Sequence, residues 1–352
     1  MVRKKRWLAA TCTLLMALPL TACGLATDSG GDGEKITLRL SHQWPAVDQT
    51  GEGDFRSMLA RRFADEVRER TDGLVDITIY PSNSLIEDPT QQYDAITRGA
   101  VDMSVFPLDY ASGDAPEFSI TLMPAMVRNH VEARKWQDAE IGKRIEEMTE
   151  SNGVKVLTWV WNAGAIGTKG AQPLVSPDDV RRGTVTRAAG SRVERMLENA
   201  GLGISSVASS EIYSAMQTGV LDSAVTSTSS FSSYRLHEQV KSFTSPTGGN
   251  TFWFMFEPLI IGTEQFNKLT PEQQTIMEEV GQELQEFAYT ESEQDDLRVE
   301  QEFKDAGVNV VQMDDKAFEK WRTEAQPVWE DFSKSVPDGA ELIELARQPS
   351  GR

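Results

Sequence analysis

The pattern of apolar and polar positions after residue 35 predicts a strand, a helix and a second strand. Apolar side chains alternate with polar ones over residues 36–40, which is the period of a strand. They recur at helical spacing over residues 55–67, and the sequence 71–73 (TDG) ends that helix. Residues 74–80 read as another strand, stopped by Pro81. This β-α-β order is the unit of a parallel α/β sheet.

A weak internal repeat predicts two halves of similar build. Residues 93–105 (YDAITRGAVDMSV) and 213–225 (YSAMQTGVLDSAV) share Tyr, Ala, Gly, Asp and the final Val at matching positions. Each copy predicts a short helix, a glycine that ends it and a strand that opens with an acidic residue. Chance similarity is the alternative. A true repeat implies two facing α/β lobes, which bind small ligands at the carboxyl ends of their strands.

The longest helical pattern begins at Thr270, with Pro271 at the first helical position and Gln273 completing a capping box. It runs to about residue 306, roughly 54 Å at the usual rise. It is either one helix that spans both lobes or two helices broken near Gly281. The remaining patterns predict strands at 154–161, 184–187 and 252–261, and helices at 131–151, 191–200, 211–218, 315–335 and 339–347.

The N-terminus predicts export and a lipid anchor. Residues 3–6 (RKKR) are basic, residues 7–20 are apolar over the length of a signal-peptide core, and 20–23 (LTAC) form a lipobox. We therefore expect a lipoprotein signal peptide at 1–22, an acylated Cys23 and a flexible linker at 23–35. The protein would be held at the extracytoplasmic face of the cell membrane, facing the periplasm or the cell surface. An ordinary signal peptide with an incidental cysteine and an uncleaved anchor are the alternatives.

The charge, the cysteine count and the length of the chain limit its possible partners and its architecture. The chain has 35 Lys and Arg against 54 Asp and Glu, a net charge of −19. Loss of residues 1–22 would make it −23, and such a surface repels nucleic acid, so we expect no nucleic-acid partner. No cysteine follows Cys23, which excludes a disulfide or a thiolate metal site in the mature chain. About 320 folded residues exceed a single core, which again favours two lobes.

Enzyme signatures are missing from the sequence. The three histidines lack metal-ligand spacing, and no nucleophile elbow, P-loop or dinucleotide-binding glycine motif occurs. We therefore expect a non-enzymatic protein that needs no cofactor and no metal.

One arginine has a distinctive position. Arg187 ends a short predicted strand, just before a Gly190-Ser191 turn into a helix. A side chain there points into the crevice at the carboxyl edge of the sheet. Its guanidinium offers two parallel N–H donors that match a carboxylate. The residues alone leave two interpretations open, a ligand clamp or a surface salt bridge.

Several segments at their expected separations resemble the solute-binding proteins of TRAP transporters, the DctP type. They are Phe63–Gly73 (FADEVRERTDG), 79–85 (IYPSNSL), Asp178–Ser191 and Glu211–Asp222 (EIYSAMQTGVLD), within a similarity that runs from about 36 to 311. The resemblance implies an α/β, two-lobed periplasmic-binding-protein-like fold with a long helix that spans both lobes. It implies lobe I at 36–163 plus 251–291 and lobe II at 164–250 plus 292–345. It also implies capture of a small organic acid between the lobes and delivery to TRAP membrane permease subunits.

The resemblance places the carboxylate-clamping arginine of the family on Arg187. A second family arginine falls on Ile166, a family asparagine on Thr226 and a first-loop pocket position on Gln43. These departures favour a monocarboxylate with an apolar, aromatic or cationic remainder over a sugar acid or a dicarboxylate. Three tryptophans complete the predicted ligand contacts, with core packing as the alternative for each: Trp44, Trp161 and Trp253.

Three other functions stay open at this stage. The same fold could serve an ABC importer or a sensor kinase, which neighbouring genes would reveal. An exported lipoprotein hydrolase would need a nucleophile constellation and turnover. A structural envelope lipoprotein would show no thermal shift with any solute.

Overall fold

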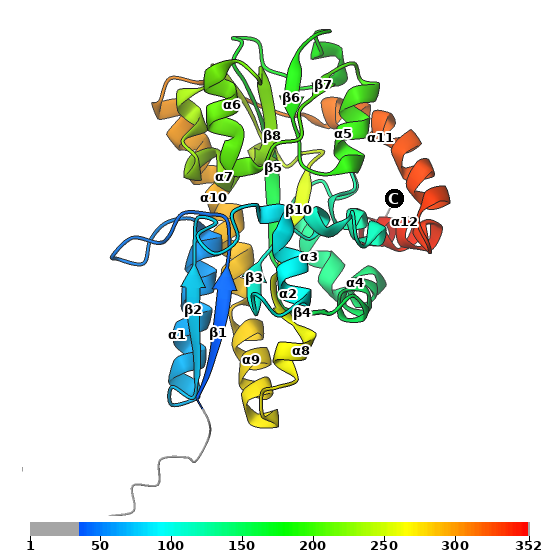
Figure 1. Ribbon diagram of the computed structural model, residues 1–352. Helices are drawn as coiled ribbons and strands as arrows, with labels where there is room; N and C mark the ends of the chain where they lie inside the picture. Colours follow the sequence, from blue (N-terminus) through cyan, green and yellow to red (C-terminus); the bar gives the residue numbers. More distant parts are fainter. Residues whose placement is uncertain (1–34, 351–352) are drawn as a thin grey trace, which may run out of the picture. The chain divides into compact units, whose positions relative to one another are not determined.

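Two β-sheets organise the chain, as a computed structural model that describes residues 35–350 shows (Figure 1). The predicted signal peptide 1–22, Cys23 and nearly all of the linker 23–35 lie outside the described residues. The strands are β1 Ile36–Ser41, β2 Val75–Tyr80, β3 Met103–Val105, β4 Val154–Thr158, β5 Trp161–Thr168, β6 Val185–Arg187, β7 Gly203–Ile204, β8 Ser223–Ser227, β9 Ser242–Ser245, β10 Phe254–Phe256, β11 Leu259–Gly262 and β12 Asn309–Gln312.

Helices surround these strands. They are α1 Phe55–Arg70, α2 Gln92–Thr97, α3 His130–Asp138, α4 Glu140–Ser151, α5 Ser191–Asn199, α6 Ile212–Thr218, α7 Thr228–Ser233, α8 Thr263–Phe266, α9 Pro271–Glu283, α10 Gln285–Asp305, α11 Asp315–Ser335 and α12 Gly339–Arg347. Two short 3-10 helices also matter below, η2 Leu108–Ala111 and η3 Pro116–Leu122.

Sheet 1, the five-stranded sheet, has the order β2-β1-β3-β11-β4. The first three strands are parallel, whereas β11 is antiparallel to both β3 and β4. Helix α1 covers it with an apolar face, because Phe55, Leu59, Phe63 and Val67 are all fully buried. The predicted β-α-β unit is therefore present.

Sheet 2, the seven-stranded sheet, has the order β12-β9-β5-β8-β6-β7, with β10 paired to the first part of β5. Strands β6, β7 and β8 are parallel to one another, and β5 is antiparallel to β8 and β9. Sheet 2 occupies the upper part of Figure 1 and sheet 1 the lower part.

The chain passes between the sheets at two places where the sequence pattern predicted unbroken strands. The apolar run 154–161 divides into β4 in sheet 1 and β5 in sheet 2, with Trp159 and Val160 between them. The run 252–261 divides in the same way at Glu257 and Pro258. The two connections lie side by side, because the Glu257 amide donates to the Val160 carbonyl at 2.8 Å. The apolar pattern continues through Trp159 and Val160, so hydrophobicity could not reveal the first break, whereas Glu257 and Pro258 interrupt the pattern at the second.

The long helical pattern is confirmed as α9 and α10, separated only by Leu284, whose backbone stays near helical angles. The predicted capping box is present: the Thr270 hydroxyl accepts from the Gln273 amide, and the Gln273 side chain accepts from the Thr270 amide. Gly281 does not break the helix. It lets the helix approach β4, because a Cβ there would lie 2.3 Å from the Leu157 carbonyl oxygen. Helix α10 packs against α1 on the side of sheet 1 and against α7 on the side of sheet 2.

The internal repeat is confirmed as structure. The first copy forms α2 and β3, and the second forms α6 and β8. The shared glycines, Gly99 and Gly219, have φ of +72° and +81°, where a side chain would be strained. The predicted helix 131–151 is instead two helices, α3 and α4, because Ala139 is extended between them.

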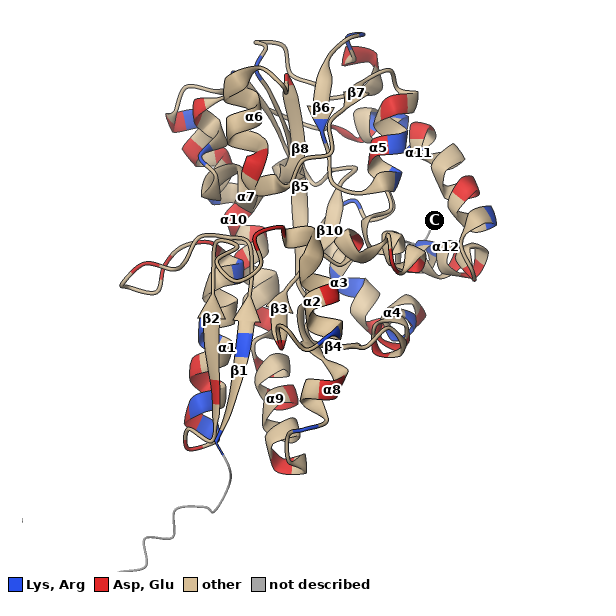
Figure 2. Cartoon of the chain, viewed as in Figure 1, with Lys and Arg blue, Asp and Glu red and all other residues tan. Residues whose placement is uncertain are grey.

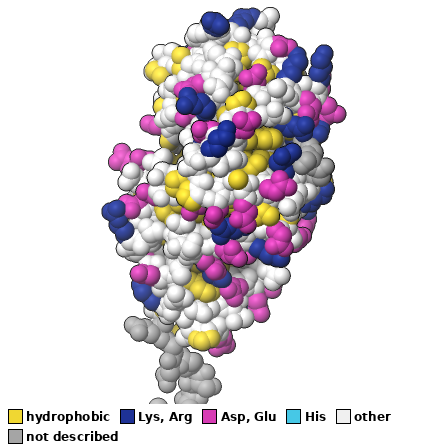
Figure 3. All heavy atoms as spheres, turned by 90° about the vertical axis from the view of Figure 1, so that its right-hand side faces the viewer, with side chains coloured by type: hydrophobic (Ala, Val, Ile, Leu, Met, Phe, Trp, Pro, Cys, Tyr) yellow, Lys and Arg dark blue, Asp and Glu magenta, His cyan; other side chains and the backbone are white. Residues whose placement is uncertain are grey.

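Acidic residues are spread over the helices around both sheets (Figure 2). On the face shown in Figure 3, acidic and basic side chains are interspersed, with hydrophobic side chains in small patches between them. Within residues 35–350, no helix combines the length and apolarity that a membrane span requires. The same residues contain no cluster of His, Cys, Asp and Glu suited to a metal ion.

Candidate ligand-binding site

The carboxyl ends of the parallel strands of the two sheets face each other. Residues that follow β1 and β3 contact residues that follow β6 and β8, and we call this region the junction. Its segments are residues 42–44 and 106–110 on the side of sheet 1, and 187–190, 207–209 and 226–230 on the side of sheet 2. In open α/β sheets this edge is where ligands bind.

Arg187 lies at the junction, at the end of β6 as the sequence predicted. Its side chain is 1% exposed. Nε donates to the Val207 carbonyl at 2.9 Å, and Nη1 donates to the Val225 carbonyl at 3.2 Å. Nη2 donates across the junction to the Tyr110 hydroxyl at 3.1 Å. These bonds use three of the five N–H groups that a guanidinium carries.

The charge of Arg187 has no direct counter-ion. Among the described residues, no carboxylate oxygen lies within 4 Å of its guanidinium nitrogens, although many other lysine and arginine side chains form ion pairs. Glu194 on α5 feels the positive charge, but its carboxylate accepts from the Ser206 hydroxyl at 2.6 Å. Burial raises the pKa of Glu194, and the charge of Arg187 only partly offsets this. A buried cation that is bonded only to neutral groups is poised for an anion.

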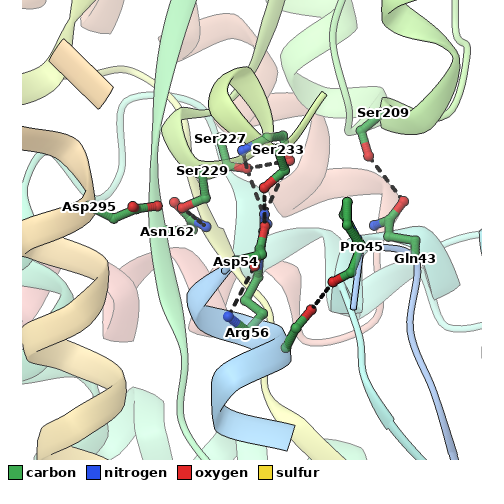
Figure 4. A network of polar contacts seen from close by, with 12 residues as sticks. Gln43, Pro45, Asp54, Arg56, Asn162, Ser209, Ser227, Ser229, Ser233 and Asp295 are labelled. Atoms are coloured by element: carbon green, nitrogen blue, oxygen red, sulfur yellow. Dashed lines mark hydrogen bonds and ion pairs between the residues drawn. The ribbon is translucent and has the colours of Figure 1, made fainter. Parts of the chain in front are cut away.

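Gln43 also lies at the junction. Its side-chain oxygen accepts from the Ser209 hydroxyl at 3.0 Å, and its backbone carbonyl accepts from the Tyr234 hydroxyl at 3.2 Å. Both donors belong to the side of sheet 2. Gln43 therefore links the two sheets, and Figure 4 shows its bond with Ser209.

Thr226 and Ile166 lie in sheet 2, near its carboxyl edge. Thr226 is on β8 opposite Ala165, and Ile166 is on β5 opposite Val225, whose carbonyl accepts from Arg187. Both side chains are buried, at 2% and 3% exposed. Ile166 offers an alkyl side chain at this point, so it cannot act as a second cation.

The three predicted tryptophans have different surroundings. The ring of Trp44 lies beneath the Arg56 guanidinium, 3.8 Å from its central carbon. Trp161 packs among aromatic rings, including Trp136 and Phe256, which favours a core role. Trp253 lies beside the Arg187 segment, because its indole N–H donates to the Ala189 carbonyl at 3.3 Å. Ligand contact by each of the three stays a prediction.

A second arginine at the junction escaped the sequence analysis. Arg56 on α1 is fully buried and holds two carboxylates. Nε and Nη2 donate to Asp54 at 2.8 and 2.6 Å, and Nη1 donates to Glu257 at 2.9 Å. The same guanidinium donates to the hydroxyls of Ser227 at the end of β8 and Ser230 on α7.

The Arg56 network extends further through both sheets (Figure 4). The Ser233 hydroxyl donates to Asp54 at 2.6 Å, and the Asn162 amide donates to Glu257 at 3.2 Å. Burial alone would raise the pKa of Asp54, but the charge and hydrogen bonds of Arg56 lower it. For Glu257, burial outweighs the attraction of Arg56, and the pKa is raised.

Arg56 carries no sequence signal of its role, whereas Tyr110 could have been found through the internal repeat. Arg56 reads as a polar residue in the first turn of an amphipathic helix, and its partner Glu257 is distant in the chain. For Tyr110 a signal existed in the internal repeat. The repeat makes the segment after Val105 equivalent to the segment at Thr226, so residues 106–110 could have been expected at the same edge.

Comparison with known proteins agrees with this architecture. Residues 46–335 match the family described as "Bacterial extracellular solute-binding protein, family 7" (DctP). A solute-binding protein of Albidiferax ferrireducens is 37% identical over 88% of this chain and 91% of its own length. The C4-dicarboxylate-binding periplasmic protein DctP of Rhodobacter capsulatus is 26% identical over 92% of this chain and 93% of its own. A crystal structure of a TRAP periplasmic solute binding protein from Rhodoferax ferrireducens, with bound malonate, superposes with a TM-score of 0.85. It is 36% identical and covers 89% of this chain and 98% of that one.

The fold and the site thus define an α/β solute-binding protein of the periplasmic-binding-protein type, in which two sheets meet around a buried arginine. The chain belongs to the bacterial extracellular solute-binding proteins of family 7, the DctP family of TRAP transport systems. This confirms the predicted fold, the extracytoplasmic binding function and the absence of an enzymatic role.

Proposed function

We propose that this protein captures a small carboxylate-bearing solute at the junction and delivers it to the permease subunits of a TRAP-type transporter. One observation carries the proposal: Arg187 is a buried guanidinium without a carboxylate partner among residues 35–350. Two of its N–H groups remain for a ligand, enough for a bidentate carboxylate. The relative with bound malonate, 36% identical, supports a ligand of this class.

Closure of two lobes would provide the capture step. We propose lobe I at 36–163 plus 251–291 and lobe II at 164–250 plus 292–345. The connections between the sheets at Trp159–Val160 and Glu257–Pro258 lie a few residues from two of these boundaries. Helix α12 packs against α4, which favours assigning the last helix to lobe I instead. On closure, exclusion of water strengthens the pairing of Arg187 with the solute.

A ligand screen with a variant tests the proposal directly. Arg187→Ala should lose roughly 2–5 kcal/mol of binding free energy for any solute whose carboxylate it holds. Isothermal titration calorimetry on hits from a thermal-shift screen of organic acids and amino acids measures this. Arg182→Ala is the matched control, because Arg182 is exposed in the same segment. Equal affinities of wild type and Arg187→Ala would refute the clamp.

We also propose that the mature protein is anchored to the membrane through an acylated Cys23. The lipobox at 20–23 and the basic residues 3–6 support this. Cys23→Ser should move the protein from the membrane fraction to the soluble extracytoplasmic fraction. Cys12→Ser is the control and should leave the distribution unchanged, because Cys12 lies within the proposed signal peptide.

A further inference from the structure

Asp109 is a buried carboxylate without a protein partner. It lies in η2, directly after β3, and is 3% exposed. Among the described residues, none donates a hydrogen bond to its carboxylate, and Oδ1 is completely enclosed. Burial raises the pKa of Asp109 to about 7. An unpaired buried acid is costly, so its presence needs a reason.

The carboxylate of Asp109 faces the turn that follows Arg187. A Cβ placed on Gly190 would lie 3.2 Å from Asp109 Oδ2, and Gly190 has a φ of +92° that favours glycine. The next residue along the chain, Tyr110, accepts the hydrogen bond from Arg187. The unpaired acid and the unpaired guanidinium therefore lie at the same part of the junction, contributed by opposite sheets.

The charged groups around Asp109 do not neutralise it. Two charged side chains on α5 act on Asp109: the negative charge of Glu194 raises the pKa of Asp109, and the positive charge of Arg192 lowers it. Arg192 is already bonded to Asp331, and Glu194 adds a second negative charge. Arg56, the other buried arginine of the junction, is held between Asp54 and Glu257.

A ligand with a carboxylate and a cationic N–H group would satisfy both unpaired charges. We propose that the solute is a small amino-acid-like zwitterion. Its carboxylate binds Arg187, and its protonated amine donates to Asp109. A dicarboxylate would place its second negative charge near Asp109 and Glu194. Among the described residues, no second cation is available there to pair with it, because Ile166 supplies only an alkyl group where the family has an arginine. This inference rests on the proposed function, because it assigns a second contact in the same site.

Matched ligands test the inference. One set has a three-carbon frame, 3-aminopropanoate, propanoate and malonate. A second has four carbons, 4-aminobutanoate, butanoate and succinate, and the proteinogenic amino acids extend the amine series. Calorimetry at pH 7.5 should give the tightest binding to an amino acid. Asp109→Asn should weaken that binding about 30-fold or more, yet leave the affinity for the amine-free analogue unchanged or higher. Asp114→Asn, an exposed acid nearby, is the control.

The outcomes separate this inference from the proposed function. In one outcome, carboxylates bind through Arg187 while an added amine brings no gain in affinity, or while Asp109→Asn leaves the affinity unchanged. Either result overturns the inference of a zwitterionic ligand but not the proposed function. Tighter binding of malonate or succinate than of every amino acid overturns it as well. Failure of every carboxylate to bind in an Arg187-dependent manner overturns both. A far-UV spectrum of Asp109→Asn equal to that of the wild type, with an unfolding transition at least as stable, excludes misfolding as the cause.

Discussion

Two buried arginines lie at the junction, and their surroundings differ in one respect. Arg56 and Arg187 are 0% and 1% exposed, and both bond to neighbours on the two sheets. Arg56 is saturated by two carboxylates and two hydroxyls. Arg187 is bonded only to two carbonyls and a phenol. Burial alone therefore does not distinguish the two arginines, whereas the presence or absence of an internal counter-ion does.

The difference has an energetic basis. Removing one member of a buried ion pair leaves the other charge unpaired, which is strongly destabilising. Removing a buried charge that had no partner leaves no such charge behind. The same substitution should therefore cost much more stability at Arg56 than at Arg187.

The largest effect is expected at Arg56. Arg56→Met leaves Asp54 and Glu257 buried without a cation and should lower the free energy of unfolding by about 3–5 kcal/mol. Urea unfolding measures this, with Arg61→Ala as an exposed control on the same helix. Adding Asp54→Asn and Glu257→Gln should recover part of the loss. A stability equal to that of the wild type would contradict the role of Arg56 in joining the sheets.

Arg187→Met should sharpen the contrast. In the unliganded protein it removes three hydrogen bonds to neutral groups but also a buried unpaired charge, so the unfolding free energy should change by only about 1 kcal/mol. A ligand at 100 times its Kd stabilises the wild type by about 2.7 kcal/mol. The variant should lose this gain at the same ligand concentration. Thermal unfolding with and without ligand measures both, and a loss as large as that of Arg56→Met would abolish the distinction.

Asp109 predicts a pH dependence with a defined sign. Its folded pKa of about 7 lies above the usual carboxyl value, which is about 3.9. Between these values the folded chain binds more protons than the unfolded chain, so the free energy of unfolding falls as pH rises. Asp109→Asn removes this fall. The variant should match the wild type near pH 4 and exceed it increasingly up to pH 7, in urea unfolding without ligand. A constant difference across this range would contradict the assignment.

The smallest effect is expected at Tyr110. Tyr110→Phe removes the hydroxyl that accepts from Arg187 across the junction, while keeping the ring against Phe106. We expect a loss of about 1 kcal/mol in ligand binding and little change in the stability of the unliganded protein. Calorimetry distinguishes this from the larger loss in Arg187→Ala. An unchanged affinity would mean that Tyr110 does not position Arg187.

Most of the architecture could be predicted because local patterns carry it. The Gly-Ser turn after Arg187 marked the end of β6 and the start of α5, and the capping box at Thr270 marked the start of α9. The repeat gave α2–β3 and α6–β8. The first passage of the chain between the sheets was hidden, because residues 159–160 interrupt a strand without interrupting the apolar pattern. Glu257 and Pro258 do interrupt that pattern, and they were an available signal for the second passage.

Residues of the candidate site could be predicted only where a family pattern or a strand end identified them. Arg187 and Gln43 lie at the junction, and their contact with a ligand stays a prediction. Arg56 and Asp109 were missed because their meaning depends on long-range neighbours. A charged residue in an α/β sequence gives no sign of whether folding will bring a counter-ion to it. That information resides in the contacts between the sheets.

The interleaving of the two sheets also bears on when the chain can fold. Strand β11 lies between β3 and β4 in sheet 1, although it follows every strand of sheet 2 except β12 in the sequence. Sheet 1 therefore stays incomplete until residue 262 has been synthesised, and an emerging N-terminal half cannot close its own core. Such a chain can complete its core only after most of it has been synthesised.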